Sequence, residues 1–279
     1  MTYQTILVPL DNELAGVCRT TAALGLARAF DCHLSGVAAT DHHDLPTNLL
    51  AAGAIAHLPT LSRDVLTEHA TTAALRFEIA CRLAGVDRYD SVVEESDAPA
   101  SFRRHAHAHD LALLSQPDPL LPAHADKASQ LVDALLTSAR PVLILPYTSN
   151  GQPIGRRPLV AWDDSREATR AIADALPFLK RAERVDVVCW RRYGSADRHI
   201  HENLEAIARW LGSHGIEAMT SVETTEIEVA DAMLSRACDA GTDLIVMGAY
   251  GHSRIAERLL GGVSQSILAT MTVPVLMSH

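Results

Sequence analysis

Short apolar segments alternate with longer amphipathic segments along the whole chain. The amphipathic segments carry apolar residues three and four positions apart, which is typical of helices that bury one face. The helix expected after Asp164 should end early, because Pro177 interrupts it. In the second half of the chain, five apolar runs rich in branched side chains predict strands near 158–162, 185–190, 216–222, 243–247 and 273–277. Strands that alternate with helices predict a parallel sheet covered by helices on both faces.

This order of elements occurs twice, so the chain aligns with itself. Residues 5–11 match residues 157–163, and both segments are apolar and end in an aspartate. The ends of the two halves align without a gap, 110–114 with 243–247 and 140–145 with 272–277. The repeat predicts two copies of one strand and helix arrangement.

A polar, turn-rich segment, residues 147–155, lies between the copies and is expected to link them. A length of 279 residues suits two domains of ordinary size. We therefore predict an α/β protein of two tandem, doubly wound, Rossmann-like domains, each with a five-stranded parallel sheet. The expected domains are residues 1–147 and residues 157–279.

Four glycines surround the junction between a predicted strand and the next helix: Gly248, Gly251, Gly261 and Gly262. Glycine permits positive φ and lets a ligand approach the backbone closely. The free N–H groups at the start of the following helix, near Ser264, would attract an anion. The alternative is a loop whose glycines serve only the turn and the helix entry.

The first half lacks these glycines. The aligned positions hold Ser115, Asp118, Ala128 and Ser129. Because this copy is expected to build the same strand, loop and helix without them, a ligand role for the glycines of the second copy is favoured.

With these residues the chain resembles a tandem universal stress protein, a family of the adenine nucleotide alpha hydrolase-like fold. The family motif is Gly, two residues, Gly, nine residues, Gly and then Ser or Thr, and Gly248, Gly251 and Gly261 match it. Gly262 stands where the family has a hydroxyl. The resemblance implies that the second domain binds ATP, ADP or AMP, with Mg²⁺ as a candidate companion ion. It also implies a nucleotide-responsive regulator of the stress response.

The resemblance further implies that the ligand lies beyond the carboxyl ends of the first and fourth strands. Asp163 would accept a bond from the ribose or the adenine edge, although it could instead cap the following helix. Trp190 would stack on adenine or fill its place, and Ser264 would supply a hydroxyl. The expected binding residues are Ala161, Trp162, Asp163, Cys189, Met247, Gly248, Gly251, His252, Gly261, Gly262, Val263 and Ser264.

Composition narrows the function. A net charge of −10 argues against a nucleic-acid surface. The five cysteines are scattered without a Cys-x-x-Cys pair, and no apolar run is long enough for a membrane span, so we expect a cytoplasmic protein. No phosphate-loop or nucleophile-elbow motif occurs, so any ATP hydrolysis should be slow.

Two other functions remain open. The histidine-rich first half could hold zinc and act as a metal-dependent hydrolase or metal sensor, with His105 and His109 on one helix face and His42 or His43 nearby. Alternatively, the chain could be a ligand-free scaffold. The last strands of the halves, 142–145 and 273–277, would then pack together as an intramolecular pseudo-dimer, and they could also support a homodimer.

Overall fold

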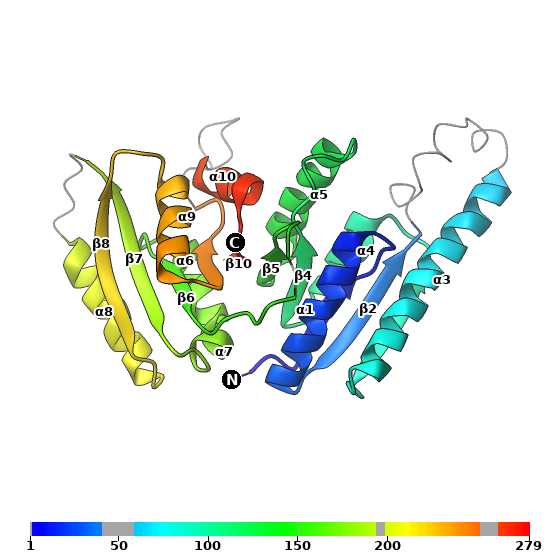
Figure 1. Ribbon diagram of the computed structural model, residues 1–279, viewed down its shortest axis with the longest axis horizontal. Coiled ribbons are helices and arrows are strands. Elements are labelled where there is room, and N and C mark those ends of the chain that lie inside the picture. Colours follow the sequence, from blue (N-terminus) through cyan, green and yellow to red (C-terminus); the bar gives the residue numbers. More distant parts are fainter. Residues whose placement is uncertain (1, 41–58, 150, 194–198, 252–261) are drawn as a thin grey trace. The chain divides into compact units, whose positions relative to one another are not determined.

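The computed structural model describes residues 2–40, 59–149, 151–193, 199–251 and 262–279 (Figure 1). The predictions for His42, His43, His252 and Gly261 therefore lie outside the described residues. The chain divides into two compact parts, an N-terminal unit of Tyr3–Arg140 and a C-terminal unit that contains Pro141–His279.

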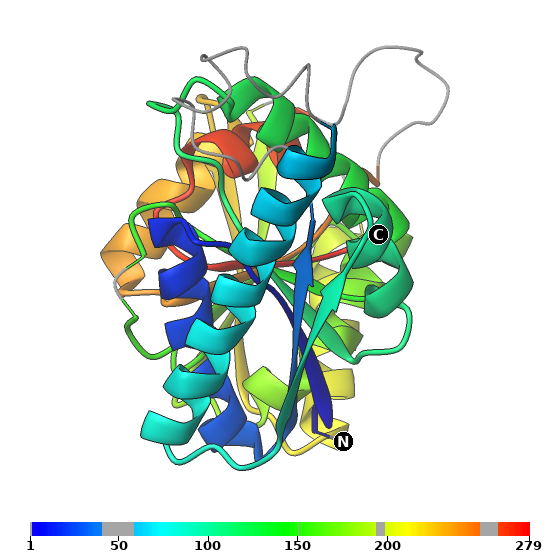
Figure 2. The same cartoon turned by 90° about the vertical axis from the view of Figure 1, so that its right-hand side faces the viewer.

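The N-terminal unit contains four parallel strands in the order β3-β2-β1-β4. The helices α1 and α3 contact each other and pack against the strands β1 and β2, as Figure 2 shows. The strands are β1 (Thr5–Pro9), β2 (His33–Ala39), β3 (Tyr89–Glu94) and β4 (Leu111–Ser115). The helices are α1 (Leu14–Phe30), α3 (Pro59–Leu83), α4 (Ala98–Ala106) and α5 (His124–Thr137).

The C-terminal unit contains six strands in the order β5-β10-β9-β6-β7-β8. Five of them run parallel, and β5 pairs antiparallel with β10, with Leu143 opposite Leu276. The strands are β5 (Val142–Leu145), β6 (Pro158–Ala161), β7 (Val185–Arg192), β8 (Ala218–Thr225), β9 (Leu244–Gly248) and β10 (Val275–Ser278). The helices are α6 (Arg166–Asp174), α7 (Leu176–Leu179), α8 (Ile200–Ser213), α9 (Val229–Ala240) and α10 (Gly262–Thr270).

The predicted α/β architecture with a mostly parallel sheet is confirmed. Four of the five strands predicted in the second half differ from the observed strands by at most two residues at either end, whereas β8 begins two residues later and ends three residues later than expected. Pro177 acts as anticipated, because α6 ends at Asp174 and the short α7 begins at Leu176. Residues 142–145, expected at the end of the first domain, form β5 of the C-terminal unit.

The two units repeat specific hydrogen bonds. Trp162 N donates to Val188 O at 2.9 Å, and the aligned Leu10 N donates to Val37 O at 2.8 Å. The repeated aspartates also share a role, because each accepts backbone N–H bonds from the segment that enters the first strand. Asp110 accepts from the N–H groups of Gln4 and Thr5, and Asp243 accepts from those of Arg156 and Arg157. Residues that align between the two halves of the sequence therefore occupy equivalent positions within their units.

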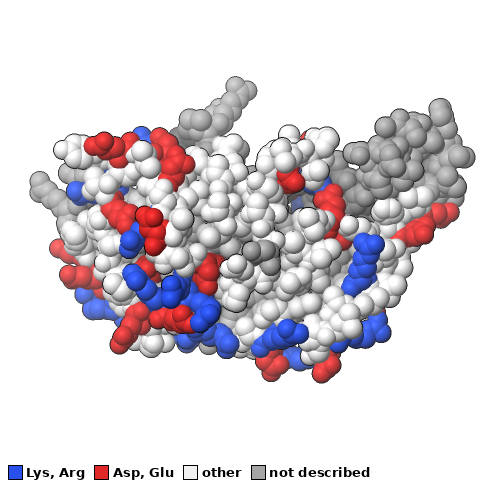
Figure 3. All heavy atoms as spheres, viewed as in Figure 1, with Lys and Arg blue, Asp and Glu red and all other residues white. Residues whose placement is uncertain are grey.

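In each unit the central strands of the sheet are buried, and this fixes the positions of the strand ends. Ile6, Leu7 and Val8 of β1 have no exposed surface, and the same is true of Leu244, Ile245 and Val246 of β9. Such strands are buried on both faces, which explains why their sequences read as continuous apolar runs. In Figure 3, acidic and basic side chains are interspersed over the described part of the face shown. Within the described ranges, no helix is both long and apolar enough to span a membrane.

Candidate functional site

The site begins where the winding of the C-terminal sheet reverses. The strands β6 and β9 are parallel neighbours, with Leu159 opposite Ile245. From β6 the chain proceeds to β7 on one side, whereas from β9 it proceeds to β10 on the other. A crevice therefore opens beyond the carboxyl ends of these two strands, which is where open α/β sheets bind ligands.

A cavity of about 270 Å³ lies at this point. Its wall is mainly apolar on the side of β7 and α9, where Trp190, Val229 and Met233 contribute. The described residues that line the cavity are Ala161, Trp162, Asp163, Trp190, Val229, Met233, Met247, Gly248, Tyr250, Gly251, Gly262, Val263 and Ser264.

This lining includes nine of the twelve binding residues expected from the sequence, and also Trp190, which was expected beside the base or in its place. Cys189 is buried but is not part of the wall. Sequence reasoning missed Val229, Met233 and Tyr250. The first two lie four positions apart on α9 and so share one helix face, a pattern that also fits ordinary core packing. Their place at the cavity depends on tertiary structure and has no signal of its own in the sequence.

Asp163 organises the turn between β6 and α6. Its Oδ1 accepts hydrogen bonds from Ser165 N at 3.1 Å and from Ser165 Oγ at 2.6 Å. Ser165 is the N-cap of α6, and its Oγ accepts a bond from Ala168 N. The alternative of Asp163 as the cap is therefore wrong, because the cap lies two residues further on, at Ser165. The Asp163 side chain supports the cap and lines the cavity as well.

Gly248 is required by packing. A Cβ at this position would lie 2.5 Å from Ala168 N and 2.6 Å from the carbonyl carbon of Glu167, both of them backbone atoms. The first turn of α6 thus approaches β9 too closely for any side chain. In the N-terminal unit the aligned Ser115 has room, since its Oγ lies 3.4 Å from Ala15 O.

The loop after β9 differs from the expected geometry. Gly248 and Gly251 were expected to permit positive φ, but among the described residues of the loop positive φ occurs at Tyr250, at 56°. A residue with a side chain adopts this conformation only when its surroundings hold it there. The Tyr250 N–H donates to Ser264 Oγ at 3.2 Å, which ties the loop to the first turn of α10.

Gly262 and Gly251 have different surroundings. At Gly262 no atom of the described residues lies within 4 Å of an added Cβ. At Gly251 an added Cβ would lie 2.8 Å from Glu167 Oε2, the end of a side chain that could move. The atoms that an added Cβ at Gly251 would meet all belong to side chains. Of these three glycines near the cavity, Gly248 is the one whose added Cβ would meet described backbone atoms.

Glu167 places a buried carboxylate beneath this loop. Burial opposes its ionisation, but its own backbone N–H, the adjacent Arg166 and the charge of His279 outweigh that effect and hold the Glu167 pKa below its ordinary value. The Arg166 guanidinium donates to Glu167 Oε1 at 2.9 Å. The carboxylate is therefore charged at neutral pH.

Three polar atoms of the lining residues are buried without a hydrogen-bond partner in the part of the chain that the structure describes. They are Nε1 of Trp162, Nε1 of Trp190 and Oη of Tyr250. Burial also raises the pKa of the Tyr250 phenol. An unpaired buried donor costs about 1–3 kcal/mol, and a ligand with acceptor atoms would offset that cost. The chemistry of the wall therefore fits a flat, polar-edged molecule such as a nucleobase.

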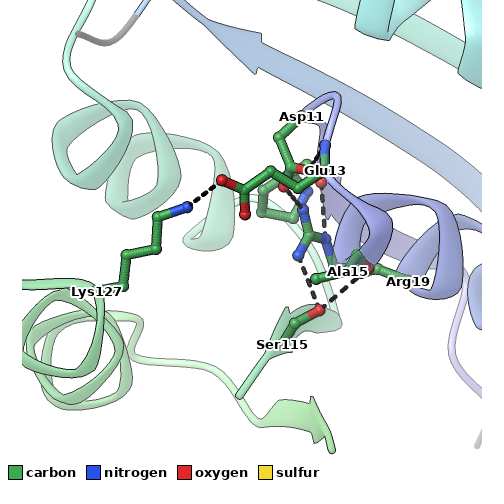
Figure 4. Close-up of polar contacts among 7 residues, drawn as sticks. Asp11, Glu13, Ala15, Arg19, Ser115 and Lys127 are labelled. Atoms are coloured by element: carbon green, nitrogen blue, oxygen red, sulfur yellow. Dashed lines mark hydrogen bonds and ion pairs between the residues drawn. The ribbon is translucent and has the colours of Figure 1, made fainter. Parts of the chain in front are cut away.

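The corresponding strand ends of the N-terminal unit are bridged by one buried side chain (Figure 4). The guanidinium of Arg19 donates to Pro9 O at 2.8 Å, to Ser115 Oγ at 2.9 Å and to Asp11 Oδ2 at 2.5 Å. It thus joins the end of β1 to the end of β4. Beside Asp11 the described residues leave a void of only about 10 Å³. Lys127 of α5 pairs with Glu13 next to this network.

The proposed zinc ligands are not arranged as expected. The helix α4 ends at Ala106, so His109 lies beyond it, and the prediction that His105 and His109 share a helix face is wrong. The His109 ring bonds to His105 O, and His105 Nε2 lies 3.3 Å from Glu94 Oε2. In the described part of the chain, no group of three or more His, Cys, Asp or Glu residues could hold a metal ion.

Fold and crevice together define a doubly wound α/β protein with a candidate ligand cavity at its switch point. The sequence model of the universal stress protein family matches residues 156–279. The second half of the chain is therefore a universal stress protein domain.

Solved structures resemble the whole chain. A universal stress protein from Archaeoglobus fulgidus is 18% identical, with a TM-score of 0.77, and the match covers 98% of this chain and 95% of that one. A functionally unknown protein from Pseudomonas aeruginosa is 16% identical, with a TM-score of 0.61 and coverage of 99% and 92%. At these identities the likeness establishes the fold alone. No curated protein sequence matched the chain.

Proposed function

We propose that the C-terminal unit binds an adenine nucleotide and that the bound nucleotide makes this protein a regulator in the stress response. The observation that carries the proposal is the cavity at the ends of β6 and β9, with aromatic residues on one side and the start of α10 on the other. This combination suits a ligand with a flat base at one end and an anion at the other.

Each part of the cavity has a role in this proposal. Trp162 and Trp190 enclose the base, and Asp163 accepts hydrogen bonds from ribose hydroxyls. The first N–H groups of α10, at Val263 and Ser264, face a phosphate, which the helix dipole also favours. Universal stress protein domains provide the context of a nucleotide-responsive switch, and the family match supports that context.

Two finer points belong to the same proposal. We infer a cytoplasmic protein in which Mg²⁺ accompanies any polyphosphate ligand. In the described lining Asp163 is the one ionisable side chain besides the Tyr250 phenol, so the site offers no paired acid and base. Nucleotide hydrolysis would therefore be slow, and signalling would depend on occupancy.

The chain offers a direct optical test. It contains three tryptophans, of which Trp162 and Trp190 line the cavity, whereas Trp210 lies on α8 and is not part of the wall. We expect adenine nucleotides to change the intrinsic fluorescence of wild type and of Trp210→Phe. The double variant Trp162→Phe with Trp190→Phe should lose this signal.

A glycine pair provides the binding control. Gly251→Asp would place a carboxylate in the cavity and should abolish binding. Gly212→Asp, on the exposed last turn of α8 where no atom lies within 4 Å of an added Cβ, should leave binding intact. Mass spectrometry of molecules released from the denatured protein would identify any retained nucleotide. If nothing is retained and no adenine nucleotide binds, the proposal is wrong.

A further inference from the structure

Residues 248–251, here called the cavity loop, carry the chain from the end of β9 along the C-terminal cavity. Gly248, Tyr250 and Gly251 belong to the cavity wall, whereas Ala249 between them is fully buried. Each of these residues is in contact with a different part of the fold, Gly248 with the backbone of α6 and Tyr250 with Ser264 Oγ. The position of Ala249 therefore affects the wall on both of its sides.

The end of β10 holds Ala249 through both of its backbone polar groups. The Ala249 N–H donates to Ser278 O at 2.9 Å, which continues the parallel pairing of β9 and β10. The Ala249 carbonyl oxygen lies 3.0 Å from Nδ1 of His279. Because a carbonyl oxygen can only accept a hydrogen bond, Nδ1 carries the proton and donates. A side chain thus completes the attachment of the cavity loop to β10.

The segment that provides these contacts is itself fixed to α6. The buried Ser278 hydroxyl donates to Oδ2 of Asp174, the last residue of that helix, at 2.8 Å. The positive charge of a protonated His279 also acts on Glu167 in the first turn of α6. The Glu167 carboxylate lies beneath the cavity loop, with its Oε2 2.8 Å from the position of a Cβ added at Gly251. His279 is therefore linked to the loop by a hydrogen bond and to the carboxylate beneath it by charge.

We propose that His279 is a positioning residue for ligand binding, which holds the cavity loop in its binding conformation through the bond to Ala249. This inference rests on the proposed function, because it concerns how firmly the same site binds an adenine nucleotide. Without the imidazole, the buried carbonyl oxygen of Ala249 loses its donor, and loop conformations that expose this oxygen become more favourable. A ligand that binds one loop conformation then has a lower apparent affinity, because that conformation is less populated.

Calorimetric titration of the full chain with AMP and with ATP tests the inference. We expect His279→Ala to weaken binding by about three- to tenfold, the range that one lost hydrogen bond allows. Asparagine carries an amide N–H₂ near the position of Nδ1 and can donate to the same oxygen. His279→Asn should therefore return the affinity to within about twofold of wild type.

Ser278→Ala is the matched control. It removes a hydrogen bond from the same segment but leaves the backbone oxygen to which Ala249 donates. It should lower the free energy of unfolding while leaving the affinity unchanged. Hydrogen exchange of the free protein provides a second readout, in which the amides of Ala249 and Tyr250 should exchange faster in His279→Ala than in wild type or in Ser278→Ala.

The outcomes separate the two proposals. Wild-type affinity in His279→Ala, or a loss that His279→Asn does not restore, would overturn this inference and leave nucleotide binding in place. An equal loss of affinity in Ser278→Ala would also overturn it, since any weakening of the end of β10 would then have the same effect. Binding of neither nucleotide to wild type would overturn the proposed function and, with it, the role of His279 in affinity.

Discussion

Two glycines that line the cavity should respond in opposite ways to the same substitution. In Gly248→Ala the new Cβ would lie 2.5 Å from Ala168 N, about 0.9 Å short of the 3.4 Å at which ordinary contact begins. Because the opposing atoms are backbone, α6 must move away from β9. In Gly262→Ala no atom of the part of the chain that the structure describes lies within 4 Å of the new methyl group.

The magnitudes follow from these contacts. Overpacking a well-packed site costs about 1–3 kcal/mol. The lower entropy of the unfolded chain returns about 0.4–1 kcal/mol where φ is compatible with alanine, as it is at Gly248. We therefore expect Gly248→Ala to lower the free energy of unfolding by about 1–2 kcal/mol. Gly262→Ala, at the first position of α10, should change it by less than about 0.5 kcal/mol or raise it slightly.

Urea denaturation followed by circular dichroism measures both changes, and a thermal scan should show Gly248→Ala melting about 2–8 °C below wild type. Wild type and Gly262→Ala should melt together. Equal stability of Gly248→Ala and Gly262→Ala would refute the reasoning, since it would mean that α6 does not approach β9 as described.

Three further predictions concern charge and thiols. Arg19→Ala should destabilise the N-terminal unit by about 3 kcal/mol in urea denaturation, because it removes a buried guanidinium and leaves the partly buried Asp11 carboxylate without its cation. Arg63→Ala, which breaks an exposed ion pair, should cost less than about 1 kcal/mol, and equal losses in the two variants would contradict this reasoning. A buried serine hydroxyl, together with neighbouring cationic side chains, holds the Glu94 pKa below its ordinary value of 4.5, so its stabilising contribution is present above that pH and disappears as pH falls through the lowered pKa. Unfolding midpoints at about pH 7 and about pH 3 should therefore differ less in Glu94→Gln than in wild type. In the native protein a thiol reagent should label Cys238, which is exposed. Cys32 and Cys81 are buried, and burial raises the pKa of each thiol to about 11, so the reagent should label them only after unfolding.

The strands and their positions along the chain were predictable because they depend on local pattern. A strand buried on both faces must read as a continuous apolar run, and its repeat in the second half makes the assignment firmer. The alignment of the two halves pairs Asp110 with Asp243, and the structure supplies the reason. The carboxylate of each accepts backbone N–H bonds from the residues at the start of the first strand of its unit.

The structural roles of individual site residues were harder to predict from the sequence. Gly248 was expected to serve a turn or a ligand, but its contact with Glu167 and Ala168 spans about eighty positions and depends on how α6 packs. The positive φ at Tyr250 likewise follows from a bond to Ser264 across a loop. The prediction that His105 and His109 share a helix face was wrong for a local reason. The helix α4 ends at Ala106, and the chain forms turn hydrogen bonds before β4 begins.

One substitution between the repeats explains why the two crevices differ. Counting from the aligned aspartates, Arg19 falls opposite Ala171, whose methyl group cannot reach across a crevice. In the N-terminal unit a guanidinium therefore bonds to both strand ends at once and, with Asp11 as its counter-charge, supplies contacts that a bound ligand would otherwise make. In the C-terminal unit those strand ends border a cavity instead. Among the described residues, the same winding thus yields a crevice that Arg19 bridges in one unit and a cavity in the other.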